Sequence, residues 1–577
     1  MSRQQYGMSS SGVITDETRQ FLVQFRENVE RGNARLLYSS YTAFQQITEK
    51  TYQVSTWPLD IDVIRALKLN HREESTKIFL YLYRELYYRH AFTRCDISVE
   101  TMHDSFQNYI NLFNTLLDYY DEGKQFAEIP NVWLWGFIDS FVSQFQYYHH
   151  FVSDPKDGYK NMAELLAQYK NNTKQKSIQQ KWNVQVVMRY LHYFVHAAQI
   201  PIKYNEPPEV NLQAQSDLNK IDRDNMNDQE QQQQAQRSRT KTPSIMMQML
   251  GFFSLIGLCR IHTILGDYRT AVDVMDPVDL KAKSAITKLA SCGISAHYYL
   301  SFAYIMTRRS PDAHSMLSTL LRNPRYEKGG IRRRFAFTEM DDEKDKKKGK
   351  EVASDQELSD KDRYHRSYLN NEAMLDRAWA MLAVAQTQSP SKLDEATLGG
   401  PLHEYFGNEM DDINDNTSSA ERRKASYAKL FSTAAPDFIN TFDPFDFEKL
   451  AKVTAQELCN NQFRAFMRLT NKRMDMLKIK NEIRLFRVIP LAKLAKAMGY
   501  EEDEISKLNR ELIRLKWRMT QNKKVDAWGN TKDQFTFYIK NDCVYVQELQ
   551  TSQLWKYSDY FIRNIQTVTD WIETEMI

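Results

Sequence analysis

The chain has 577 residues and a mass of 68.1 kDa, too long for one hydrophobic core, so about two to four domains are expected. Its formal net charge of +3 argues against a protein that coats nucleic acid over its whole surface. Only 18 Gly and 15 Pro punctuate the sequence, which favours long helices over a β-rich fold.

The five cysteines are scattered without a Cys-x-x-Cys pair, as in a reducing compartment. Met1 to Gly12 is polar, unlike a signal peptide, and no run approaches the ~18 apolar residues of a membrane span, so we expect a soluble protein of the cytosol or nucleus.

The N-terminal part of the chain has the periodicity of long helices. Residues 1–15 are rich in Ser and Gln, and a disordered tail is expected there. For residues 16–202 we predict an all-helical domain, in which Lys77–Arg89 is apolar or aromatic nearly all round and should be a buried central helix. Pro130–Trp135 and Trp182–Val184 open two further helices. The first helix should bury one face, made by Phe21, Leu22, Phe25 and Val29.

Two tracts of biased composition interrupt the helical patterns. Residues 203–243 are dominated by Asn, Asp and Gln, and include the run Gln231–Gln234, which indicates a disordered linker or insertion. Residues 326–368 are highly charged, with Lys344–Lys350 at their centre, and indicate a second, solvated insertion. The second tract lies inside residues 244–480, which we interpret as a helical-repeat region.

The repeat signal is strongest at the start of that region. Six residues there lie at offsets typical of a tetratricopeptide helix pair: Leu255, Leu258, His262, Gly266, Tyr268 and Ala271. A weaker copy begins 42 residues on (Ala271 to Ala313), with Arg308 at the position of Gly266 and Ser310 at that of Tyr268. Because ~34 residues is the usual step, we predict a degenerate solenoid. A third pair is indicated by Leu375, Trp379, Leu382 and Ala383. Residues 389–448 are poorly patterned, and no helix is predicted there.

Residues 481–552 have the pattern of a helix-turn-helix followed by a β-hairpin, which is a winged helix. The first helix has a stripe that ends before Gly499, a residue that tolerates positive φ. The second follows Glu501–Glu504, which place negative charge at its positive dipole end. The stripes are Leu491, Leu494, Ala495 and Met498 in the first helix, and Ile505, Leu508, Leu512, Leu515 and Met519 in the second. Alternating residues then predict two strands around a tight turn at Asn541-Asp542.

The second helix of this winged helix also has a basic face. Its members recur at three- and four-residue steps: Lys507, Arg510, Arg514 and Arg518. One interpretation is a solvated helix surface, since charged side chains normally face water. The other is a surface for RNA or an acidic partner. Groove-reading DNA recognition is a weaker alternative, because Glu501–Glu504 would face the phosphates and repel them.

No catalytic constellation is recognisable in the sequence. It has no Gly-x-Gly-x-x-Gly, no phosphate-binding Gly-Lys-Ser/Thr, no Gly-x-Ser-x-Gly and no His-Glu-x-x-His motif. His192 and His196 share one helical face but have no carboxylate or thiol neighbour, and a zinc site normally takes at least three protein ligands. We therefore expect no catalytic residues, no metal and no cofactor, and hence a protein that is not an enzyme.

A helical solenoid, a winged helix and a last helix at residues 553–577 together resemble the PCI module, a mainly α architecture. PCI modules build the scaffolds of the proteasome lid, the signalosome and translation initiation factor 3. Four stretches are similar, more closely, to the L-subunit family of eukaryotic translation initiation factor 3: Lys77–His90, Pro130–Trp135, Met249–Tyr268 and Ile489–Ala495. The resemblance runs from about residue 20 to the end, and the two biased tracts look like additions to the family's pattern.

The resemblance implies a non-catalytic scaffold subunit in the cytoplasm, one that supports pre-initiation complex assembly on the small ribosomal subunit and mRNA recruitment. The expected neighbours are the K and E subunits of the factor, with possible contact to mRNA or rRNA. Two partner-binding elements are expected, an edge strand of the wing with Val544, Val546 and Leu549, and the last helix, whose apolar side is made by Phe561, Ile562, Ile565 and Val568. The alternatives are a PCI scaffold of another complex, of proteasome-lid or signalosome type, and an RNA-binding adaptor.

Overall fold

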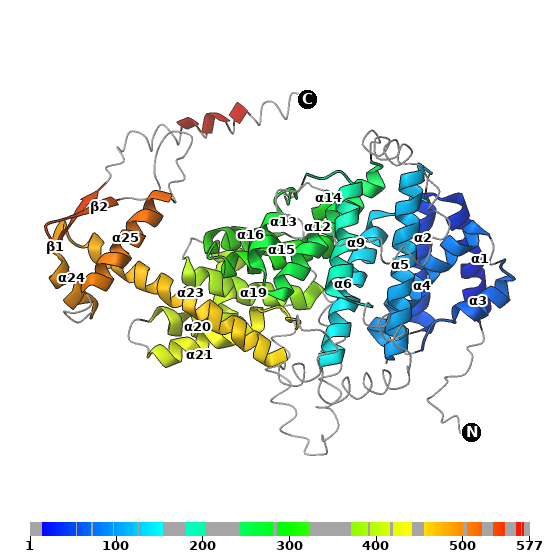
Figure 1. Cartoon of the computed structure of the whole chain (residues 1–577), viewed down its shortest axis with the longest axis horizontal. Coiled ribbons are helices and arrows are strands. Elements are labelled where there is room, and N and C mark those ends of the chain that lie inside the picture. Colours follow the sequence, from blue (N-terminus) through cyan, green and yellow to red (C-terminus); the bar gives the residue numbers. More distant parts are fainter. Residues whose placement is uncertain are drawn as a thin grey trace, which may run out of the picture. The chain divides into compact units, whose positions relative to one another are not determined.

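The computed structural model divides the chain into two compact units, Met1–Arg464 and Ala465–Ile577 (Figure 1). The residues that it describes are 14–52, 55–70, 73–95, 97–124, 126–153, 181–201, 243–280, 285–323, 371–389, 393–415, 419–440, 455–499, 505–521, 535–548, 561–562, 564–566 and 568–569. The predicted insertion at 326–368, nearly all of the predicted linker at 203–243 and most of the predicted tail at 1–15 lie outside them.

The first unit is built from helices throughout its described residues. Before residue 202 they are α1 (Asp16–Arg31), α2 (Ala34–Thr51), α3 (Asp60–Leu67), α4 (Glu74–Arg94), α5 (Val99–Glu122), α6 (Asn131–Ser153) and α9 (Val184–Ala197). After residue 243 they are α12 (Ile245–Leu265), α13 (Tyr268–Val274), α14 (Ala285–Lys288), α15 (Ala290–Met306), α16 (Ser310–Arg322), α19 (Asn371–Gln388), the π-helical turn η2 (Glu395–Gly399), α20 (Gly400–Asn414) and α21 (Ala420–Ala434). The all-helical character predicted for residues 16–202 is confirmed for the described residues of that range.

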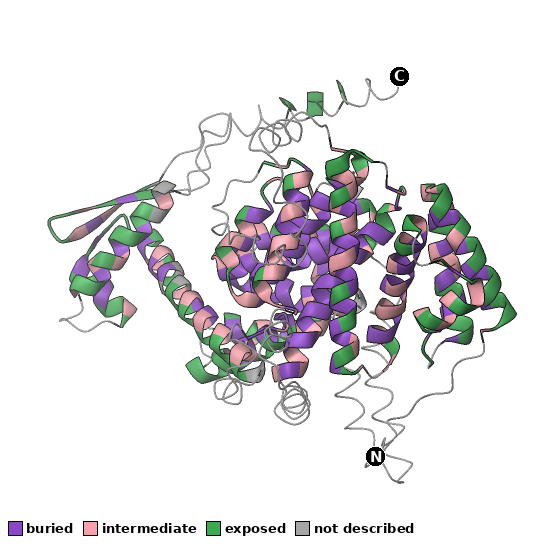
Figure 2. Cartoon of the chain, turned by 45° about the vertical axis from the view of Figure 1, so that its right-hand side comes forward, coloured by how far each residue is buried: buried purple, intermediate pink, exposed green. Residues whose placement is uncertain are grey.

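One hydrophobic core continues through this unit. The central helices α6, α12 and α15 are buried along most of their length (Figure 2). Among the described helices, α12 is long and apolar enough to cross a membrane, but 78% of its apolar window is buried inside the unit. It packs against α9 and α6 on one side of the 203–243 tract and against α15 on the other. The helices before and after that tract therefore share a core and do not form two separate ones.

The predicted repeat corresponds to two successive helix pairs, α12 with α13 and α15 with α16. Gly266 ends α12 with a positive φ of 86°, and its N–H bonds to carbonyl oxygens of the last turn. Arg308, at the equivalent position of the second copy, also has a positive φ, 66°. Ala271 and Ala313 are both fully buried, as small residues at a close helix contact should be.

The expectation that residues 389–448 contain no helix is wrong. Both α20 and α21 lie there. The periodicity of α20 is weak because the helix is kinked at Phe406, where φ is −133°, and because it buries few side chains. Those buried residues are Leu402, Gly407 and Ile413.

The second unit has the helices and sheet of a winged helix. Its described elements are the end of α23 (Ala455–Arg484), β1 (Val488–Pro490), α24 (Leu491–Met498), α25 (Ile505–Gln521), β2 (Phe535–Lys540) and β3 (Cys543–Glu548). The three strands form an antiparallel sheet in the order β1-β3-β2. The predicted turn is present, and both Asn541 and Asp542 have positive φ, as a type I′ turn requires.

The core of this unit comes from both helices of the predicted pair, from the sheet and from the end of α23. Its fully or nearly fully buried members include Ile479, Ile483, Ile489, Leu491, Leu494, Leu508, Leu512, Phe537 and Val544. The stripes predicted for the two helices supply the helical part of this core. Gly499 ends α24 with φ of 77°, as predicted, while Glu501–Glu504 lie outside the described residues.

Candidate partner-binding surfaces and buried polar networks

The last apolar side chains that the structure describes are exposed. Residues 561–562, 564–566 and 568–569 are helical, and the Thr569 hydroxyl donates to the Ile565 carbonyl at 2.8 Å, one turn back. The exposed fractions are 60% for Phe561, 39% for Ile562, 64% for Ile565 and 55% for Val568. We refer to these four residues as the terminal apolar side. Apolar side chains gathered on one side of a helix normally bury that side against another element.

The prediction that Val544–Leu549 is an edge strand of the wing is wrong for its described residues. β3 is the central strand, because β1 pairs with it on one side and β2 on the other. The Val546 N–H also donates to the Arg487 carbonyl at 2.8 Å. Val544 is fully buried in the core, Val546 is half-buried against it, and Leu549 lies outside the described residues. The edges of this sheet are β1 and β2.

The outer face of the sheet has an apolar row that the sequence reasoning missed. Val488, Tyr545 and Tyr538 are paired in register across the three strands, and all three side chains point away from the core. The Tyr538 and Tyr545 rings stack at 5.1 Å with an angle of 6° between their planes. Val488 is 51% exposed and Tyr538 is 45% exposed. The sequence did not reveal this row because β1 is only three residues long and contains a proline, so its residues show no alternation that would predict a strand.

The basic face predicted on α25 is present and exposed. Lys507, Arg510 and Arg514 are solvent-exposed, and the side chain of Arg518 lies outside those described. Arg514 forms an ion pair with Glu511, one turn back on the same helix. The structure adds two large apolar residues to this face, Ile513 at 57% and Trp517 at 63% exposed. The spacing of the basic residues alone does not reveal them.

Two of the stretches that carried the family resemblance meet in a buried polar network. Glu85 on α4 is fully buried, and its carboxylate accepts hydrogen bonds from Arg89 Nε at 3.0 Å and from Trp133 Nε1 on α6 at 2.8 Å. The Tyr109 hydroxyl on α5 donates to the same carboxylate at 3.3 Å. Gly136 leaves room for the Arg89 guanidinium, since a Cβ there would lie 2.5 Å from Nη1. This network is structural, because its groups saturate one another deep inside the unit.

A second buried network joins the helices before and after the 203–243 tract. Arg260 on α12 is 2% exposed and donates to Asp139 at 3.0 Å and to Gln146 at 2.9 Å, both on α6. Gln146 in turn donates to the Asp437 carbonyl, and Arg377 on α19 donates to the Asp437 carboxylate at 3.0 Å. Burial raises the pKa of Asp139, opposed by the neighbouring Arg260 guanidinium. Replacing Asp139 by an uncharged residue would leave the Arg260 guanidinium buried without its counter-charge.

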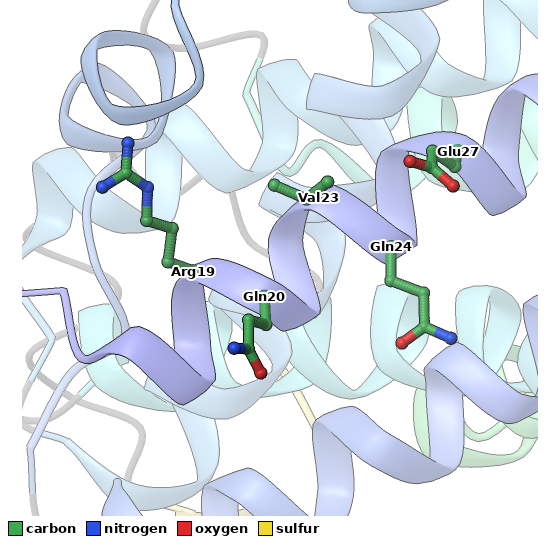
Figure 3. A pocket seen from close by; sticks show the side chains of 5 residues that line it. All are labelled: Arg19, Gln20, Val23, Gln24 and Glu27. Carbon is green, nitrogen blue, oxygen red and sulfur yellow. The ribbon is translucent and has the colours of Figure 1, made fainter.

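One hollow opens on the outer face of α1, lined by Arg19, Gln20, Val23, Gln24 and Glu27 (Figure 3). All five residues come from this one helix, and the Arg19 side chain points to one side of it while those of Gln20 and Gln24 point to the other, so the three do not converge on one centre (Figure 3). Within the described ranges, no group of three or more His, Cys, Asp or Glu side chains is placed to hold a metal ion.

Comparison with known proteins assigns the chain to a family. The model of the family described as "RNA polymerase I-associated factor PAF67" matches residues 101–347 and 354–568, which is most of the chain. The chain belongs to the PAF67 family. It is 25% identical to eukaryotic translation initiation factor 3 subunit L of Aedes aegypti, over 96% of this chain and 92% of that protein. The subunit L proteins of Danio rerio and Drosophila yakuba are 26% and 24% identical, over 91% and 96% of this chain and 78% and 91% of their own lengths.

The expected resemblance is thereby confirmed over nearly the whole length of this PAF67 family member. Homology to subunit L extends through the helical unit and the winged helix alike. In the PAF67 family member described here, the buried networks of Glu85 and Arg260 maintain the helical scaffold, while the second unit presents its apolar and basic surfaces.

Proposed function

We propose that this protein is a non-catalytic scaffold subunit of a complex of the translation initiation factor 3 type. It would support assembly of the pre-initiation complex on the small ribosomal subunit, and mRNA recruitment, in the cytoplasm. Its neighbours would be subunits of the K and E type. The support is homology to subunit L at about 25% identity over 96% of the chain, together with a fold of helices and a winged helix.

The observation that carries the proposal is the exposure of the terminal apolar side, the residues Phe561, Ile562, Ile565 and Val568. Leaving apolar surface in water costs roughly 25 cal/mol for each Å² that a partner could cover. A helix with this pattern buries the most apolar surface when it joins a bundle with helices of other subunits. The outer row of the sheet, with Val488 and Tyr538 exposed, offers a second apolar contact on the same unit.

Aspartate substitutions on the terminal apolar side test the proposal. Phe561→Asp and Ile565→Asp place a carboxylate where a partner would have to bury it, so each should abolish incorporation into the complex. Gln566→Asp is the matched control, because residue 566 is exposed on the same helix but lies about 100° or more around it from Phe561 and Ile565, at the border of that side next to Ile562. The measurement is affinity purification of the N-terminally tagged chain from its own cells, followed by mass spectrometry.

The proteins recovered with the unmodified chain decide the function class. Initiation factor 3 subunits together with small-subunit ribosomal proteins would support the proposal. Proteasome-lid or signalosome subunits, or the chain alone, would refute it. Unchanged co-purification of Phe561→Asp and Ile565→Asp would show that assembly uses another surface.

A further inference from the structure

The exposed side of α25 gathers two arginines and two large apolar side chains. Arg510, Ile513, Arg514 and Trp517 follow one another at steps of three, one and three residues, which places all four on one side of the helix. We call these four residues the α25 patch. The opposite side of α25 is buried in the core of the winged helix and consists of Leu508, Leu512 and Leu515.

Trp517 is unusual among the tryptophans of this protein. The other five whose side chains are described are buried, and they are Trp57, Trp133, Trp135, Trp182 and Trp379. Trp517 is 63% exposed, and its neighbour one turn back, Ile513, is 57% exposed. An indole stabilises a fold mainly when it is buried, so an indole held on the surface is available to a ligand.

The charge of α25 is concentrated and positive. From Ile505 to Gln521 the helix has five cations and one acid, a net charge of +4 (5 − 1), whereas the whole chain has +3. The acid, Glu511, is paired with Arg514 at the surface. The Arg514 side chain is 61% exposed, so a phosphate can still reach the guanidinium of this pair.

We propose that the α25 patch binds single-stranded RNA, with a base stacked on Trp517 and phosphates held by Arg510 and Arg514. An exposed aromatic ring among guanidinium groups is the combination that binds single strands with little sequence preference. Trp and Arg are also enriched at protein–protein interfaces, so the net charge of +4 on α25 is what favours a polyanion as the ligand. This inference goes beyond the scaffold role, which uses the terminal apolar side.

A single strand fits better than a duplex groove for a reason of charge distribution. A helix that reads a groove presents its N-terminal residues to the bases. In this chain Glu501–Glu504 come immediately before α25 in the sequence, whereas the arginines of the patch lie in the middle of the helix. Arg510 and Trp517 are seven residues apart, about 10 Å along the helix axis, enough for only a few nucleotides.

The test measures RNA binding by the purified full-length chain. The probe is a fluorescently labelled 12-nucleotide oligouridine, followed by anisotropy at 50 and 200 mM salt. Two phosphate contacts account for about a sevenfold loss of affinity between these salt concentrations, and Arg510→Gln/Arg514→Gln should remove that loss. Trp517→Ala should weaken binding by roughly five- to 150-fold at both concentrations, because stacking is less dependent on salt.

Matched controls remove the same groups elsewhere on the second unit. Lys493→Gln/Lys496→Gln deletes two exposed charges from α24, and Tyr538→Ala deletes an exposed ring from the sheet. Both controls should keep the affinity of the unmodified chain within about twofold. Equal losses in the patch variants and the controls would overturn the inference, since binding would then be diffuse electrostatic attraction.

Co-purification of proteins with the same variants distinguishes an RNA-binding surface from a protein interface. If Trp517→Ala leaves RNA affinity unchanged but loses a co-purifying protein, the α25 patch is a protein interface and the RNA inference is refuted. The terminal-helix variants Phe561→Asp and Ile565→Asp should keep the RNA affinity. Failure of the scaffold proposal would therefore appear in their co-purification alone.

Discussion

Replacing Glu85 by Gln should destabilise the helical unit strongly. Glu85 is fully buried, and its carboxylate accepts from Arg89, Trp133 and Tyr109. The Gln side chain has the same shape but no charge, so the Arg89 guanidinium would stay largely buried without a counter-ion. Removing one partner of a buried ion pair costs about 3–5 kcal/mol of unfolding free energy.

The control is Glu27→Gln, in the exposed pair with Arg31. This pair has the same glutamate-to-arginine spacing of four residues, but both side chains are more than half exposed. Exposed pairs of this kind contribute about 0–1 kcal/mol. The comparison of the two variants therefore isolates the effect of burial.

Hydrogen exchange followed by mass spectrometry measures both variants in the full chain, where a single unfolding transition is not expected. Amides of α4 and α6 that exchange by global opening of the unit should exchange roughly 150- to 5,000-fold faster in Glu85→Gln. In Glu27→Gln the same amides should change by less than about fivefold. Equal changes in the two variants would refute the conclusion that burial makes the Glu85–Arg89 pair more important for stability than the exposed Glu27–Arg31 pair.

Two further variants test local features. Burial lowers the pKa of His149 to about 4, whereas a histidine in the unfolded chain has a pKa of about 6.5. As the pH falls from 6.5 toward 4, the unfolded state therefore binds a proton that the folded state does not bind, and the free energy of unfolding decreases. Above pH 6.5 the histidine is neutral in both states, so this loss of stability is absent there. His149→Gln should therefore reduce the loss of unfolding free energy between pH 7 and 5 by about 2 kcal/mol, measured by hydrogen exchange at the two values, and an unchanged loss would contradict the assignment. Gly266→Ala should lower the free energy of unfolding by at least about 1–2 kcal/mol, because φ is 86° and the new Cβ would lie 3.0 Å from Gln462 Nε2. Arg308 is exposed and lies at the equivalent turn with φ of 66°, so Arg308→Gly should not lower the free energy of unfolding. Hydrogen exchange of the amides beside the two turns that shows the opposite order would refute the equivalence of the turns.

The sequence alone was sufficient for features that depend on neighbouring residues. The stripe of α25, the positive φ at Gly499 and the Asn541-Asp542 turn follow from helical spacing and local steric preference, so each was predictable. The repeat was predictable for the same reason, down to Arg308 at the turn where the first copy has Gly266. The terminal apolar side was recognised as a stripe, and its exposure is consistent with that pattern.

Only the tertiary structure decided which strand of the wing is an edge. β1 is three residues long and pairs with residues more than fifty positions later, Val488 with Tyr545, so no local pattern announces it. That pairing makes β3 central and buries Val544. The Glu85 network is similar, since its carboxylate and the Trp133 indole come from helices 48 residues apart in the sequence. Whether a polar or aromatic side chain is buried or exposed depends on which distant elements cover it, and for this reason Trp133 lies in the core while Trp517 lies on the surface.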